Sequence, residues 1–203
     1  MNPSSKHIRH LARADAILGA VMASITLPRR SRPPQNYFQA LCRSIIGQQL
    51  SVKAAATIHG RVQELFAGKQ IPGPQAFLKM PPRRLLRAGL SRQKIKYMRS
   101  LAQFMLSRKP EFSRLNRLSD EDIIALLTQI TGIGQWTAEM FLIFTLERED
   151  VFSFGDLGLQ NAIRKLYKLR QKPSLRKAIQ LSEKWRPYRS IASLYLWASL
   201  NNT

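Results

Sequence analysis

Residues 126–159 read LLTQITGIGQWTAEMFLIFTLEREDVFSFGDLGL, and this stretch decides the fold that the sequence predicts. Apolar residues at helical spacing precede the tetrapeptide TGIG, and a second segment of the same periodicity follows it. Gly132 and Gly134 flank Ile133 and predict a tight turn, because glycine adopts backbone angles that other residues resist. The first backbone N–H groups of the second helix are then exposed, which favours binding of an anion such as phosphate.

One carboxylate stands out after the second helix, because Asp156 lies between apolar residues in the sequence FSFGDL. Such a residue either caps the helix expected over 157–169 or acts as a working acid at the helix entrance, and the two roles are compatible. The turn also has an alternative interpretation. It is a plain helical hairpin in which Ile133 fills the space between the helices.

The sequence TGIGQWTA followed by DVFSFGDLGLQ resembles the helix-hairpin-helix DNA glycosylases, and more closely their 3-methyladenine DNA glycosylase II branch. Three further segments are similar to that branch: RSIIGQQLSVKAA (43–55), GLSRQKIKYMRSLA (89–102) and WRPYRSIASLYLW (185–197). The resemblance implies an all-α fold of one domain, residues 1–203, with the hairpin at about 120–146. It also implies two helical subdomains flanking a cleft, with N- and C-terminal helices forming one wall, and no substantial sheet.

Helical periodicity over most of the chain agrees with that fold class, and convincing strand alternation is absent. An amphipathic helix is expected over 9–25, with a targeting peptide as the alternative, and a Pro-rich linker follows over 28–37. The other expected helices are 37–46, 51–66, 76–80, 82–88, 91–107, 120–130, 135–146, 157–169, 174–184 and 191–200.

Charge identifies the class of partner. Lys and Arg number 33 against 12 Asp and Glu, a net charge of +21 that favours a polyanionic partner. Residues 65–110 contain no Asp or Glu, so their cations lack acids for pairing along a helix face, and phosphate contacts explain them better than a solvated surface. An anionic membrane surface is a distant alternative, because no continuous apolar face accompanies the basic segment.

Cys42 is the only cysteine, so no disulfide can form within the chain. A four-cysteine iron–sulfur cluster is excluded for the same reason. The three histidines do not form a convincing metal set, and neither a catalytic metal nor another cofactor is expected.

The resemblance implies that Asp156 is the catalytic residue. Cleavage of an N-glycosidic bond develops positive charge on the sugar, which a nearby carboxylate stabilises, and the same group can orient or deprotonate the attacking water. The nucleotide must first leave the base stack, and the protein fills the gap with a wedge residue. The family's wedge position matches Gln48, Gln49 and Leu50, with Gln49 preferred. Alternatively, these glutamines cap helix ends.

The base pocket of the branch matches Trp136, Tyr188, Met140 and Leu157. Aromatic faces there stack on the flipped base and attract a positively charged purine, although Trp136 could equally belong to a helical core. Met140 and Leu157 stand where some relatives have aromatic residues, which leaves the range of lesions open. Trp136 also occupies the position of the Schiff-base lysine in relatives that nick the strand, and an indole cannot form an imine. No lyase activity is therefore expected.

The resemblance further implies that backbone amides matching Gly132, Gly134 and Thr137 bind a DNA phosphate. Carbonyls facing the other way can coordinate a monovalent cation, Na⁺ or K⁺, and match Thr128, Ile130 and Ile133.

The sequence thus predicts a monomeric, monofunctional glycosylase that acts on double-stranded DNA containing 3-methyladenine-type or 7-methylguanine-type bases and leaves an abasic site. No membrane partner is expected, and the protein would reside in the cytoplasm and nucleoid of a bacterium or the nucleus of a eukaryote. The alternatives are a glycosylase of the same fold for deaminated or oxidised bases, and a non-catalytic helix-hairpin-helix DNA-binding protein.

Overall fold

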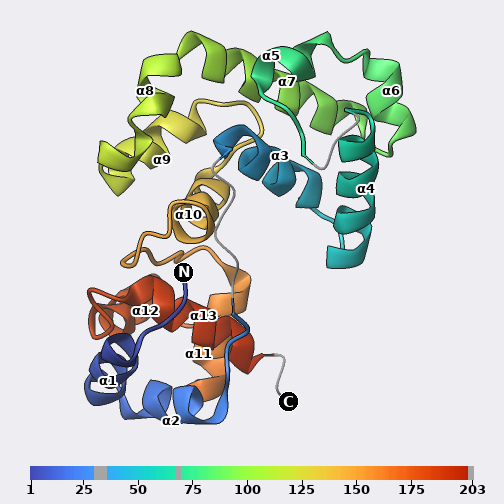
Figure 1. Cartoon of the computed structure of the whole chain (residues 1–203). Helices are drawn as coiled ribbons and strands as arrows, with labels where there is room; N and C mark the ends of the chain where they lie inside the picture. The colour runs from blue at the N-terminus through green and yellow to red at the C-terminus, as the bar shows by residue number, and fades with distance from the viewer. Residues whose placement is uncertain (30–35, 67–69, 201–203) are drawn as a thin grey trace. The chain divides into compact units, whose positions relative to one another are not determined.

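The computed structural model describes residues 1–29, 36–66 and 70–200, and within them the secondary structure is entirely helical (Figure 1). The all-α expectation is confirmed. The backbone divides into two compact units, one formed by residues 1–33 and 142–203 and the other by residues 34–141. We call them the terminal unit and the central unit. The expectation of a single domain stays a prediction.

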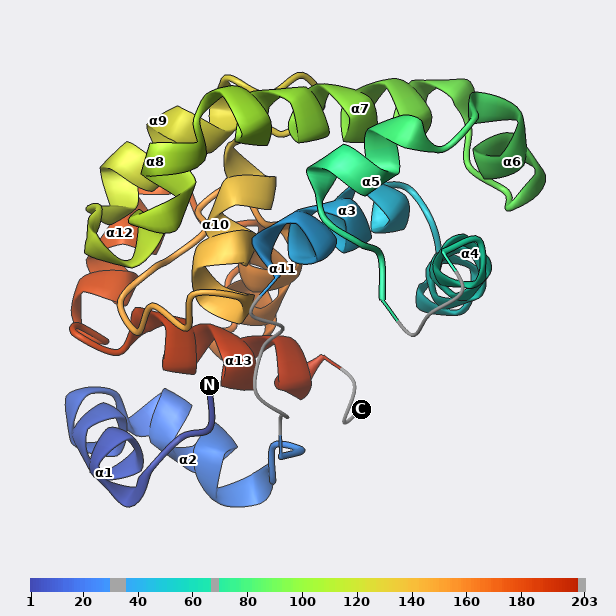
Figure 2. The ribbon, with the colours of Figure 1, turned by 45° about the horizontal axis from the view of Figure 1, so that its top comes forward.

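The central unit is built around its longest helix, α7. Its helices are α3 (Tyr37–Gly47), α4 (Val52–Glu64), α5 (Pro74–Lys79), α6 (Pro82–Arg87), α7 (Arg92–Ser107), α8 (Lys109–Ser113), a 3-10 turn (Leu115–Arg117), α9 (Asp120–Thr128) and most of α10 (Gln135–Phe144). Helix α7 packs against both α5 and α3, and Figure 2 shows α5 along its side. Serine side chains cap α4, α7 and α9 at Ser51, Ser91 and Ser119, as polar N-cap residues commonly do.

The terminal unit combines both ends of the described chain. It contains α1 (Ser5–Ala14), α2 (Ala16–Ser24), α11 (Leu157–Leu166), α12 (Leu175–Glu183) and α13 (Arg189–Ser199). Helix α13 packs against α11 and also against α2, so it lies between them (Figure 2). The core of the terminal unit includes the fully buried Trp185, Ile191 and Leu196. Helix α13 therefore connects α2, near the start of the chain, with α11.

The prediction of a single helix over residues 9–25 is wrong, because the chain forms two helices that meet at Asp15. The Asp15 carboxylate caps α2 by accepting N–H bonds from Ile17 and Leu18. It also accepts the Tyr167 hydroxyl at 2.5 Å and the Trp185 indole N–H at 3.2 Å. Burial raises the pKa of the Tyr167 hydroxyl, so this group remains protonated and donates. Four donors on one buried carboxylate therefore fix the bend.

The remaining helices lie where periodicity places them, to within a few residues at their ends. Helix α8 and the 3-10 turn were not predicted, because they are short and because a Pro and scattered polar residues interrupt the helical periodicity there. Residues 30–35 of the expected Pro-rich linker lie outside the described residues. Among the residues that are described, no helix combines the length and apolar character needed to cross a bilayer.

Candidate active site and DNA-binding hairpin

The predicted hairpin joins α9 to α10 through a closed turn. The Ile130 N–H donates to the Leu127 carbonyl, and the Ile133 N–H donates to the Ile130 carbonyl at 3.0 Å. Ile133 is buried, as the alternative of a packed helical hairpin expects. The first helical bond of α10 runs from the Ala138 N–H to the Gly134 carbonyl. By helix geometry, the N–H groups ahead of Ala138 have no acceptor within the helix.

The two glycines of the turn have different environments. Gly132 has a φ of +92°, and a Cβ there would lie 2.2 Å from the Tyr97 ring, so the fold itself requires glycine. A Cβ on Gly134 would meet nothing within 4 Å, and Gly134 is exposed. Intramolecular packing therefore does not explain the second glycine, whereas close approach of an external backbone would.

The turn between α3 and α4 is bonded to the hairpin. The Gln48 side-chain amide donates to the Gly132 carbonyl at 2.9 Å. The Lys94 ammonium on α7 donates to the carbonyls of Ile46 and Gln48 at 2.8 and 2.9 Å, closing the end of α3. Partial burial lowers the pKa of Lys94. Two side chains thus hold this turn in place within the central unit.

Those bonds distinguish the three wedge candidates. Gln48 has its amide engaged with the hairpin, which favours a positioning role for it. Gln49 is exposed and adopts a φ of +57°, and Leu50 is an exposed apolar residue beside it. Because both side chains are exposed, Gln49 and Leu50 stay the predicted wedge residues.

Asp156 begins helix α11 as its N-cap. One carboxylate oxygen, Oδ1, accepts the Leu159 backbone N–H at 2.8 Å and the Trp197 indole N–H at 2.9 Å. Asp156 is 8% exposed. Its capping role is confirmed, and the two donors fix the orientation of the carboxylate at a helix N-terminus, where negative charge is favoured.

Trp197 and Gly158 belong to this site, although sequence reasoning assigned them no role. A Cβ on Gly158 would lie 3.0 Å from Asp156 Oδ1 and 3.0 Å from Trp197 Cδ1, so glycine leaves space for their hydrogen bond. The Trp197 ring also lies 5.6 Å from the Phe144 ring. Trp197 is the last residue of the segment WRPYRSIASLYLW. That segment resembles the family, but its sequence does not predict the bond from Trp197 to Asp156.

The four predicted pocket residues differ in exposure. Trp136 at the start of α10 is 47% exposed and Leu157 at the start of α11 is 60% exposed. The alternative that a helical core buries Trp136 is therefore wrong. Met140 is buried in the central unit.

Tyr188 is buried in the core of the terminal unit, with ring centroids 4.6 Å from His7 and 5.1 Å from His10. This environment favours a packing role for Tyr188. Stacking of a base on its ring stays a prediction.

The predicted phosphate ligand at Thr137 is its backbone N–H, which lies ahead of Ala138 in α10, while the residue itself is buried. The Ile130 carbonyl already accepts the Ile133 N–H. A cation at that carbonyl would therefore use its second lone pair, while the carbonyls of Thr128 and Ile133 would supply the rest. Within the described residues, no three His, Cys, Asp or Glu side chains are grouped as metal ligands.

An all-α scaffold with a glycine hairpin and a helix-capping aspartate defines a helix-hairpin-helix protein. The sequence profile of the HhH-GPD superfamily base excision DNA repair proteins matches residues 42–187. The DNA-3-methyladenine glycosylase 1 of Schizosaccharomyces pombe is 37% identical over 171 residues, which cover 84% of this chain and 75% of that protein.

Solved structures agree with the sequence match. The S. pombe 3-methyladenine DNA glycosylase in complex with abasic DNA has a TM-score of 0.86 and 32% identity, covering 97% of each chain. A DNA-3-methyladenine glycosidase from Bacillus halodurans has a TM-score of 0.84 and 35% identity, covering 100% of this chain and 92% of that one. The chain belongs to the HhH-GPD superfamily of base excision DNA repair proteins.

Proposed function

We propose that the protein is a DNA glycosylase that hydrolyses the N-glycosidic bond of alkylated bases of the 3-methyladenine and 7-methylguanine type, leaving an abasic site. The observation that carries this proposal is the Asp156 carboxylate, fixed by two N–H donors at the start of α11 in a chain of this family. The names of the similar glycosylases support the substrate class.

Asp156 acts as the electrostatic partner of the sugar. The C1′–N bond breaks with its electron pair leaving on the base, and the positive charge that develops on the sugar is stabilised by the carboxylate. Water then adds at C1′, and its proton passes to Asp156 or to solvent. Alkylated purines already carry positive charge and leave readily, so one acidic residue is sufficient.

The hairpin and the α3–α4 turn bind the duplex around the flipped nucleotide. The N–H groups at the start of α10 contact a phosphate, and the exposed Gly134 lets the DNA backbone approach closely. Gln49 or Leu50 enters the gap in the base stack, while Trp136 offers an exposed aromatic face to the extruded base. Double-stranded DNA containing a damaged base is the proposed partner of the monomer.

The reaction stops at the abasic site. Lyase chemistry requires an amine that forms an imine with the sugar, and the hairpin position in question holds Trp136. Lys165 and Lys168 lie at and beyond the end of α11, away from that position in the sequence.

Release of free base from a methylated duplex tests the proposal. We expect 3-methyladenine and 7-methylguanine in the supernatant and intact strands until alkali is added. Duplexes carrying uracil, hypoxanthine or 8-oxoguanine should release base far more slowly. Preferential release from one of those duplexes would contradict the substrate class, and strand breaks before alkali treatment would contradict the absence of lyase activity.

A further inference from the structure

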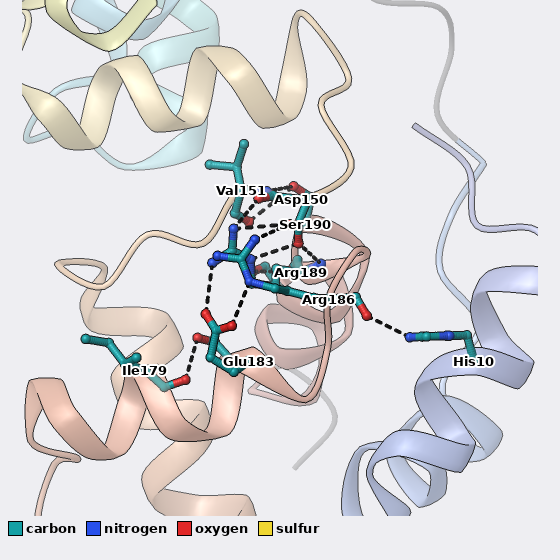
Figure 3. A network of polar contacts seen from close by, with 10 residues as sticks. His10, Asp150, Val151, Ile179, Glu183, Arg186, Arg189 and Ser190 are labelled. Carbon is teal, nitrogen blue, oxygen red and sulfur yellow. Dashed lines mark hydrogen bonds and ion pairs between the residues drawn. The ribbon is translucent and has the colours of Figure 1, made fainter. Parts of the chain in front are cut away.

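The segment that leads to Asp156 starts with an ion pair to helix α13. Arg189, the first residue of that helix, donates from Nε to Asp150 Oδ1 at 2.8 Å, and its terminal nitrogen donates to Asp150 Oδ2 at 3.2 Å. The same nitrogen donates to the Asp150 backbone carbonyl at 2.7 Å (Figure 3). Arg189 thus holds both the side chain and the backbone of one residue. Its side chain is only 13% exposed, so solvent screens these bonds little.

Ser190, the next residue of α13, binds the adjacent backbone. Its hydroxyl accepts the Val151 N–H at 3.0 Å and donates to the Val151 carbonyl at 3.2 Å. Its own backbone N–H donates to the Glu149 carbonyl at 2.9 Å. Ser190 is fully buried, so these bonds define the path of the backbone through residues 149–151.

The far end of the same segment is also attached to α13. Trp197, about two helical turns beyond Arg189, donates to the Asp156 carboxylate at 2.9 Å. Between the two ends, the Phe152 ring packs 5.6 Å from the Trp185 ring, and the Gln160 amide donates to the Phe154 carbonyl. Helix α13 therefore fixes both the start of the segment 149–156 and the position of the Asp156 carboxylate at its end.

We propose that Arg189 and Ser190 are positioning residues for the reaction, because they set the path of residues 149–156 and hence the place of the Asp156 carboxylate. This inference rests on the proposed function. A displacement of about 1 Å at a reacting group can lower a rate about 100-fold, so loss of the Arg189 bonds acts on the chemical step while leaving the DNA-binding hairpin intact.

Arg186 provides a matched control, since it contacts the same carboxylate from outside. It donates one bond to Asp150 Oδ2 at 2.8 Å and pairs with Glu183, but its side chain is 48% exposed and it does not bond the Asp150 backbone. Figure 3 shows Arg186 and Arg189 around Asp150. Neutralising Arg186 removes one charge beside Asp150 and leaves the three bonds from the Arg189 side chain.

The test compares Arg189→Met, Ser190→Ala and Arg186→Gln in the full chain. Single-turnover release of base from a methylated duplex should fall at least about tenfold in Arg189→Met, with the dissociation constant for DNA unchanged within about threefold. The rate of Ser190→Ala should also be lower than that of wild type, and Arg189→Lys should retain part of the rate that Arg189→Met loses. The rate of Arg186→Gln should remain within about threefold of wild type.

A spectroscopic measurement reports the carboxylate directly. The indole ¹⁵N–¹H resonance of Trp197, assigned with Trp197→Phe, should move in Arg189→Met and Ser190→Ala and stay in place in Arg186→Gln. If Arg189→Met and Ser190→Ala release base at the wild-type rate and leave the Trp197 resonance unmoved, the inference is overturned. It is also overturned if these two variants only lower the melting temperature and keep the wild-type rate. If Arg189→Met does not fold, Ser190→Ala decides by the same criteria. Failure of the proposed function shows separately, as absence of base release by the wild type.

Discussion

At the scale of single residues, the two hairpin glycines have separable roles. Gly134→Ala adds a methyl group in open space, so the melting temperature should stay within about 2 °C of wild type. The same methyl group would meet an approaching DNA backbone, and affinity for an abasic duplex should fall at least about tenfold. Thermal unfolding and fluorescence anisotropy measure the two effects.

Gly132→Ala is the comparison, because its Cβ would lie 2.2 Å from Tyr97 and the fold must shift. That variant should lose stability first. Full DNA affinity in Gly134→Ala would show that the open space beside Gly134 is not where the DNA approaches.

Gly158→Ala tests the Asp156–Trp197 hydrogen bond from a different direction. Alanine favours a helix over glycine by up to about 1 kcal/mol, so stability should hold. The new methyl group would press on Asp156 Oδ1 and the Trp197 ring, both 3.0 Å away. The single-turnover rate should therefore fall about tenfold without loss of DNA binding. A wild-type rate would mean that the orientation of the carboxylate is not critical.

Part of this site could be predicted from sequence, and part could not. The helix-capping position of Asp156 could be predicted, because the residues around it in the chain, a hairpin and then an apolar loop, form a local motif. The role of Trp197 could not, because its bond to Asp156 joins residues 41 positions apart and depends on how α13 packs against α11. Gly158 owes its importance to the same packing.

At the scale of elements, periodicity and caps located most helices, since these signals lie within one segment. The bend at Asp15 was missed for the opposite reason. Its partners Tyr167 and Trp185 lie 152 and 170 residues away, so only the folded unit shows why the helix divides there. A local apolar pattern cannot report a contact of that separation.

Asp15→Ala should cost far more stability than an ordinary helix cap. It leaves the Tyr167 hydroxyl, the Trp185 indole and two α2 N–H groups without their acceptor in a buried place, and should lower the free energy of unfolding by at least about 3 kcal/mol. Ser51→Ala removes the exposed cap of α4 and should cost about 1 kcal/mol. Urea unfolding with unchanged m values compares the two. Equal costs would refute the special role of Asp15.

At the scale of the whole molecule, the charge of +21 predicts how strongly binding responds to salt. A cluster of cations on α6 and α7 is exposed, and no ion pair holds any of them within the described part of the chain: Arg83, Arg84, Arg87, Arg92 and Lys96. If cluster and hairpin together make six or more phosphate contacts, affinity should fall at least about 10³-fold between roughly 50 and 200 mM salt. A flat response would exclude phosphate contacts as the main source of binding.

Charge and composition predicted the class of partner because both are sums over the chain and need no coordinates. The division into a terminal and a central unit is a different kind of property. It places the Asp156 carboxylate and the hairpin glycines in separate units. Such a division follows from packing between distant segments, which sequence spacing alone does not contain.

The measurement that tests the central claim most directly is base release by Asp156→Asn from a methylated duplex, read beside its affinity for the same duplex. Asparagine keeps an oxygen that can accept the Leu159 and Trp197 N–H groups, so the fold and DNA binding should persist. The lost negative charge should lower the single-turnover rate at least about 100-fold. Base release at the wild-type rate, with binding intact, would contradict the assignment of Asp156 as the residue that performs the chemistry.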